Sequence, residues 1–105
     1  MKSGRGRFRR GEPAEATRRG LRSEILELRE ELELLDDVLQ AGPTPLSARA
    51  SLDRALFSLR AAEHSWREVS EPGDLLEVVE QLDAARAALD ASLEALRRRA
   101  ARAGR

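Results

Sequence analysis

The chain has 105 residues, and its 19 basic and 19 acidic side chains give a formal net charge of zero. This length is sufficient for one domain. The absence of cysteine excludes disulfide staples, thiolate catalysis and cysteine-ligated zinc. No uninterrupted apolar run exceeds three residues, whereas a membrane-spanning helix needs roughly 20. No apolar stretch follows the basic N-terminus, so we expect no signal peptide and a soluble, cytoplasmic protein.

The zero net charge hides a strong segregation of charge along the chain. Residues 1–22 carry eight basic and two acidic residues, and residues 97–105 carry five arginines and no acid. Between them, residues 23–96 have a net charge of −11. Two interpretations remain open. The basic ends bind an external polyanion, or they neutralise the acidic body, in part because Asp36 and Asp37 come near the C-terminal arginines.

Residues 1–13 are predicted to form a disordered basic arm. Glycines alternate with arginines in this segment, and it has no apolar periodicity. We therefore expect the ordered domain to begin at about residue 14.

The first predicted helix covers about residues 14–41. Its apolar residues are spaced alternately four and three apart, which is typical of a helix packed lengthwise against other helices. These residues are Leu21, Ile25, Leu28, Leu32, Leu35 and Leu39. The remaining positions are mainly acidic, and Gly42 and Pro43 end the helix.

The second predicted helix covers about residues 45–70. We expect Thr44 to cap its N-terminus and Pro45 to occupy its first turn. Its predicted core stripe is Leu52, Ala55, Leu56, Leu59, Ala62, Trp66 and Val69. Pro72 and Gly73 then interrupt the helical pattern.

The third predicted helix covers about residues 74–103 and leaves residues 104–105 as a tail. Asp74 and Glu77 have the spacing of a capping box at its start. Its predicted core face is Leu75, Val78, Val79, Leu82, Ala85, Leu89, Leu93 and Leu96.

These helices predict an all-α fold, an antiparallel up-down-up three-helix bundle with coiled-coil-like packing and flexible basic termini. The antiparallel order follows from the two connections, which are too short to let the chain return along the rod before the next helix begins. In this topology the two basic ends lie at opposite ends of a rod.

Residues that could carry chemistry are few. His64 is the only histidine, and the glycines form no phosphate-binding loop. Serines lie near His64 in sequence, but no third group is marked out to orient a catalytic base. We therefore expect no catalytic, cofactor-binding or metal-binding residues, and a protein that is not an enzyme.

The surface left over by the bundle points instead to protein interactions. One face of the second helix lies well away from its core stripe and carries Phe57, which would be an exposed aromatic residue. The hypothetical interface residues are Leu46, Ala50, Phe57 and Ala61 of this helix and Ala84, Ala88, Ala91 and Ala95 of the third. The favoured function is a non-catalytic helical module that self-associates or docks a protein partner.

The alternative function is association with nucleic acid or another polyanion through the arginine-rich ends. Arginines, with one interleaved aromatic residue, can contact phosphates and stack on bases. The hypothetical contact residues are Arg5, Arg7, Phe8, Arg9, Arg10, Arg97, Arg98, Arg99 and Arg102. Because the body is acidic, we expect such binding to be weak and sensitive to salt, and we expect no membrane binding.

Overall fold

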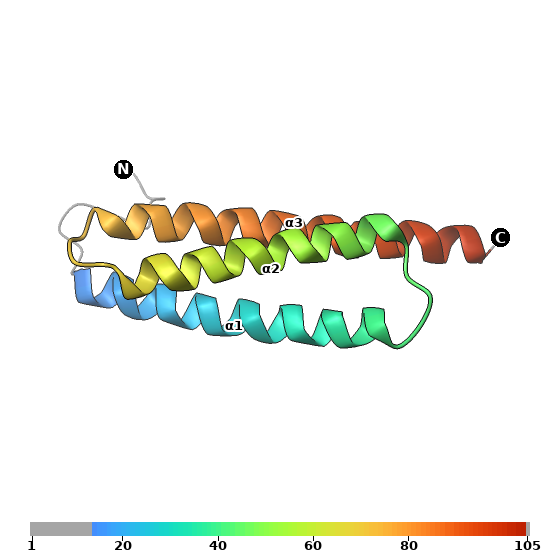
Figure 1. Ribbon diagram of the computed structural model, residues 1–105, viewed down its shortest axis with the longest axis horizontal. Coiled ribbons are helices and arrows are strands. Elements are labelled where there is room, and N and C mark those ends of the chain that lie inside the picture. The colour runs from blue at the N-terminus through green and yellow to red at the C-terminus, as the bar shows by residue number, and fades with distance from the viewer. Residues whose placement is uncertain (1–13, 105) are drawn as a thin grey trace.

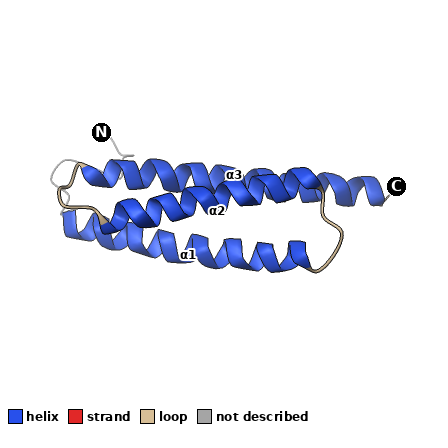
Figure 2. Ribbon diagram, viewed as in Figure 1, coloured by secondary structure: helices blue, strands red, loops and turns tan. Residues whose placement is uncertain are grey.

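Three helices make up the computed structural model, which describes residues 14–104. They are α1 (Ala14–Gln40), α2 (Leu46–Arg67) and α3 (Asp74–Ala103), and no strand occurs within residues 14–104. The helices run alternately along one rod and lie side by side (Figures 1 and 2). The predicted all-α, up-down-up bundle is therefore confirmed. The predicted basic arm at residues 1–13 lies outside the described residues.

The core of α1 is the leucine-rich seam. All six predicted seam residues are buried, with Leu28 and Leu32 completely inaccessible to solvent. The 4-3 spacing keeps their side chains on one side of the helix, where they pack against the other two helices. Burial of each leucine contributes about 1.5 to 3 kcal/mol, so this seam is the main hydrophobic contribution of α1 to the bundle.

α2 and α3 pack more closely together than α1 packs against either, since most close backbone approaches between helices join α2 to α3. Small residues explain this closeness, because a short side chain lets two helix backbones approach. Small buried residues are Ala48, Ser51, Ala55 and Ala62 on α2, and Ala85 and Ser92 on α3. The large side chains of the α1 seam hold that helix farther away.

One core position of α3 differs from the prediction. Leu93 was expected in the core, but it is 37% exposed, and the neighbouring Ser92 is completely buried instead. The Ser92 Oγ donates a 2.8 Å hydrogen bond to the carbonyl oxygen of Ala48. The close α2–α3 contact admits a small side chain there, and the hydrogen bond satisfies its hydroxyl group.

The predicted N-terminal caps of α2 and α3 are both wrong. Thr44 makes no cap for α2; its Oγ1 donates to the carbonyl oxygens of Leu39 at 2.6 Å and Gly42 at 3.1 Å. It thereby satisfies a carbonyl that the end of α1 leaves without a helical partner. The Asp74 carboxylate likewise reaches backwards, where it accepts hydrogen bonds from the backbone N–H groups of Ser70 at 3.0 Å and Glu71 at 3.1 Å.

α2 ends at Arg67, short of the predicted end near residue 70. The backbone N–H of Glu68 closes the last turn on the carbonyl oxygens of His64 and Ser65. Trp66 and Val69 still pack against the core while remaining partly exposed. The Arg18 guanidinium lies 5.1 Å from the centroid of the Trp66 ring, a cation–π contact that ties the start of α1 to the end of α2.

The bundle is an elongated rod measuring 53 × 30 × 16 Å. α3 is the longest helix, and its C-terminal turns project beyond the ends of α1 and α2 (Figure 1). α1 begins at the opposite end of the rod (Figure 1). Within the described residues, no helix is both long enough and apolar enough to cross a membrane.

Candidate interaction surfaces

The outer face of α2 carries the most exposed aromatic side chain of the described residues. Phe57 is 73% exposed and Leu46 is 87% exposed, while Ala55 and Leu59 on the opposite side of the helix are buried. Ala50 is also exposed, and Ala61 is partly exposed. The four α2 residues of the hypothetical interface therefore lie on one side of the helix, facing away from the core.

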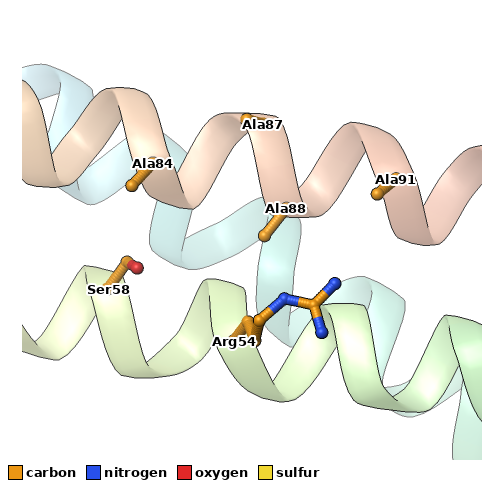
Figure 3. A pocket seen from close by; sticks show the side chains of 6 residues that line it. All are labelled: Arg54, Ser58, Ala84, Ala87, Ala88 and Ala91. Carbon is orange, nitrogen blue, oxygen red and sulfur yellow. The ribbon is translucent and has the colours of Figure 1, made fainter.

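A shallow groove of about 430 Å³ runs between α2 and α3 (Figure 3). Its walls are Arg54 and Ser58 of α2, and Ala84, Ala87, Ala88 and Ala91 of α3. The methyl groups of Ala84 and Ala88 are directed toward α2, and the Arg54 guanidinium extends into the space between the helices (Figure 3). An Arg54 nitrogen donates a 3.1 Å hydrogen bond to Ser51 Oγ, which orients the guanidinium beside the alanine-lined wall.

The groove and the outer face of α2 are continuous. Phe57 follows Arg54 by three positions and Ala61 follows Ser58 by three, so each pair occupies neighbouring positions on the helix surface. Sequence reasoning found three of the four groove alanines but missed Ala87, Arg54 and Ser58, because nothing in the sequence shows which polar residues of α2 face α3. Ala95 is partly exposed and does not line the groove.

A second apolar surface, missed by the sequence analysis, lies on α1. Leu34 is 67% exposed and Val38 is 62% exposed, four positions apart on the outer side of the helix. Leu34 lies in a shallow depression of about 300 Å³ with Glu30, Glu33 and Asp37. The spacing of Leu34 and Val38 is that of a second apolar stripe along the helix, but acidic residues surround it in the sequence and obscure the pattern. Leu26 is also exposed, at a different position around α1.

The C-terminal arginines are all exposed on the projecting part of α3; they are Arg97, Arg98, Arg99 and Arg102. None of the ion pairs among the described residues joins these arginines to Asp36 or Asp37, the neutralisation that the charge pattern left open. Arg97 and Arg98 instead pair with Glu94 of the same helix, at 3.2 and 3.4 Å.

Asp36 is engaged elsewhere. It pairs with Arg49 of α2 at 2.8 Å and accepts a hydrogen bond from Gln40 at 2.9 Å. The predicted contact residues Arg5, Arg7, Phe8, Arg9 and Arg10 lie outside the described residues.

Ion pairs join α1 to the other helices. Arg29 pairs with Glu63, Arg49 with Asp36, and Arg86 approaches Glu31 at 4.0 Å. The hydrogen bond that Arg29 donates to the Glu63 carboxylate raises the pKa of Arg29, and those that Arg49 donates to the Asp36 and Asp53 carboxylates raise the pKa of Arg49. Since these side chains are exposed or half-buried, each pair contributes at most about 1 kcal/mol. These ion pairs therefore help to orient α1, while most of the stabilisation of α1 comes from burial of its leucine-rich seam.

His64 is exposed near the end of α2. It lines a shallow depression of about 290 Å³ with Ser65, Glu68, Asp74 and Glu77. Among the described residues, no group of three or more His, Asp or Glu side chains is arranged to hold a metal ion. Asp74 also has a lowered pKa, but the cause is its hydrogen bonds from the Ser70 and Glu71 backbone, which is a structural role in the loop.

No protein-family model matches the chain, and no similar curated protein or solved structure was found. The fold and its surface define a small three-helix domain with exposed apolar residues. Its function must therefore be argued from the surfaces themselves.

Proposed function

We propose that the protein is a non-catalytic interaction module that self-associates or docks a protein partner through α2 and α3. The observation that carries this proposal is the 73% exposure of Phe57 in the middle of a helix whose opposite side is buried in the core. Large aromatic side chains dominate the energetics of protein interfaces. An exposed phenylalanine next to an apolar groove is thus suited to anchor a partner.

The adjacent groove supports the same function. Its alanine wall presents no bulky side chain, so the backbone of a partner helix can approach closely, as in recognition of an amphipathic helix by a groove. Arg54 supplies a positive charge at the rim, where an acidic side chain of the partner would fit. The proposed interface comprises the outer face of α2, including Phe57, and this groove.

The direct test is Phe57→Glu with Leu26→Glu as the control, because Leu26 is exposed on a different helix. If the protein self-associates through this surface, Phe57→Glu lowers the mass in solution while helicity, measured by circular dichroism, is unchanged. The control leaves both unchanged. Loss of helicity in Phe57→Glu would instead show that Phe57 belongs to the core. An unchanged mass in solution would contradict self-association through this surface.

The partner-docking form needs a different measurement. A photo-crosslinking phenylalanine analogue at position 57 should form adducts with one predominant protein in cells, and the same analogue at position 26 should not. Equal labelling from both positions would show that Phe57 is only an exposed residue and would contradict the proposal.

A second candidate function is polyanion binding, which is favoured by the exposure of the four arginines at the projecting end of α3. The net charge of −11 over residues 23–96 opposes it, since the body repels the polymer that the arginines attract. Binding of a single-stranded oligonucleotide should then be weak and disappear near physiological salt. Tight binding at high salt would make a polyanion the principal partner.

A further inference from the structure

The end of α3 has no helical partner among the described residues. We call residues 97–103 the C-terminal overhang; all of them are exposed, and they project beyond α1 and α2 (Figure 1). At its base Leu93 is 37% exposed and Leu96 is partly buried. Ala100 continues this stripe along the overhang, with Arg97 and Arg99 on its two sides. The overhang is therefore mainly positively charged, and Ala100 is the small apolar residue that continues the side of Leu93 and Leu96.

A surface of opposite charge lies on the part of α1 that runs toward the same end of the rod (Figure 1). We call it the acidic face of α1: Leu34 and Val38 are exposed there, and Glu30, Glu33 and Asp37 surround Leu34. It is opposite to the overhang in charge, and each surface includes exposed apolar atoms. Residues 30–38 rise about 12 Å along the helix axis and residues 97–103 about 9 Å, so their lengths also match.

These two surfaces do not meet within one chain. The acidic face points away from the core side of α1, which carries the buried leucine seam. Arg97 and Arg98 pair only weakly in their own helix, with Glu94 at 3.2 and 3.4 Å on an exposed surface. Both surfaces are therefore open to a second molecule.

We propose that the C-terminal overhang of one copy docks on the acidic face of a second copy. Charge complementarity selects this arrangement, because overhang against overhang would oppose two rows of arginines, and acidic face against acidic face would oppose two rows of carboxylates. In the proposed assembly a two-fold axis relates the two copies, so that each copy contributes one overhang and one acidic face and two such contacts form. The assembly then closes as a dimer.

This dimer uses no residue of the surface proposed above on α2 and α3. Phe57 lies in the middle of α2, whereas the overhang is the end of α3 that projects from the rod (Figure 1). The two surfaces can therefore be tested separately, and failure of one does not imply failure of the other.

A charge exchange between the surfaces provides the test. The overhang variant is Arg97→Glu with Arg99→Glu, and the face variant is Glu30→Arg with Asp37→Arg; all four positions are exposed. At low salt the wild type should sediment at twice its monomer mass of 11.7 kDa. Each variant alone should be monomeric, with a dimer Kd raised at least about tenfold. An equimolar mixture of the two should recover the dimer mass, because opposite charges again meet at both contacts.

The control is Glu77→Arg with Glu80→Arg, which reverses two exposed charges near the start of α3 at the other end of the rod. It should dimerise like the wild type, and circular dichroism should show every variant to be helical. Recovery in the equimolar mixture is the decisive result when the overhang variant mixed with the control variant, which has the same net charge as the face variant, stays monomeric.

Three results would overturn this proposal. The first is a wild-type protein that stays monomeric at millimolar concentration in low salt. If that monomer binds an oligonucleotide through its overhang, the partner of the arginines is a polyanion and not a second copy. Another is a mixture that remains monomeric. The third is a dimer that persists in both charge variants and is abolished by Phe57→Glu, which would assign self-association to α2 and leave the proposed function intact.

Discussion

Ser92 of α3 donates a 2.8 Å hydrogen bond to the carbonyl oxygen of Ala48 on α2, and neither residue is accessible to solvent. This contact fixes the register of the two most closely packed helices, because a carbonyl within a helix can accept a second hydrogen bond only from a side chain that approaches closely. It also accounts for a polar residue in the core, since a buried hydroxyl without a partner is costly.

Substitutions at Ser92 should separate the hydrogen bond from the packing. Ser92→Ala removes the bond and should lower the free energy of unfolding by about 1 kcal/mol. Ser92→Leu should lower it by more, about 1 to 3 kcal/mol, because the site holds only a small side chain. Urea unfolding measures both, with Ser47→Ala, an exposed serine, as the control. A stable Ser92→Leu variant would contradict the close α2–α3 packing.

Two leucines of α1 should differ greatly in their contribution to stability. Leu28 is completely buried, so Leu28→Ala should cost about 2 to 5 kcal/mol. Leu34 is mostly exposed, so Leu34→Ala should change the free energy of unfolding by less than about 0.5 kcal/mol. Thermal unfolding at high salt, which suppresses the proposed dimer, compares the two. Equal effects would mean that the seam of α1 is wrongly assigned.

Gly20 offers a stabilising substitution. It lies inside α1 and is exposed, and a Cβ atom added there would have no other atom within 4 Å. Gly20→Ala should therefore raise the free energy of unfolding by about 0.4 to 1 kcal/mol, because alanine restricts the unfolded chain and favours the helix. A lower melting temperature for this variant would show that α1 does not extend through residue 20.

The Asp74 carboxylate should make stability depend on pH. Its hydrogen bonds from the Ser70 and Glu71 backbone hold its pKa below the ordinary value for aspartate. The ionised form stabilises the folded state, and this contribution is lost as the pH falls through the lowered pKa. The difference in melting temperature between wild type and Asp74→Asn should thus be largest near neutral pH and shrink in acid. Asp90→Asn, at an exposed site on the same helix, is the control for the substitution itself.

Gln81 should be replaceable with a gain in stability. Its side-chain oxygen is buried and has no hydrogen-bond partner among the described residues. Gln81→Met keeps a similar shape and removes the unsatisfied group, so we expect a gain of about 1 kcal/mol in chemical denaturation. Gln40→Met, at an exposed position where the amide does have a partner in Asp36, should show no such gain. A loss of stability at position 81 would indicate that the amide is hydrogen-bonded in solution.

Local patterns along the chain determined the helices and much of the core. All six seam residues of α1 are buried because a 4-3 spacing places them on one side of any helix, whatever its neighbours. Phe57 is exposed for the same reason, since its position around α2 is opposite to the buried stripe. The proline and glycine residues likewise divide the chain into three helices, independently of any contact between those helices.

Only the tertiary structure decided what depends on the distance and register between helices. The close packing of α2 and α3 buries Ser92 in place of Leu93, although leucine is the more apolar residue. Asp36 pairs with Arg49, and Thr44 and Asp74 bind backbone groups behind them, because the fold brings those partners within reach. Helical periodicity is a property of one segment of the sequence. Side-chain partners and close packing, in contrast, depend on how two segments lie relative to each other. The groove at Arg54 and the open end of α3 belong to this second kind, because they exist only once the three helices are packed together.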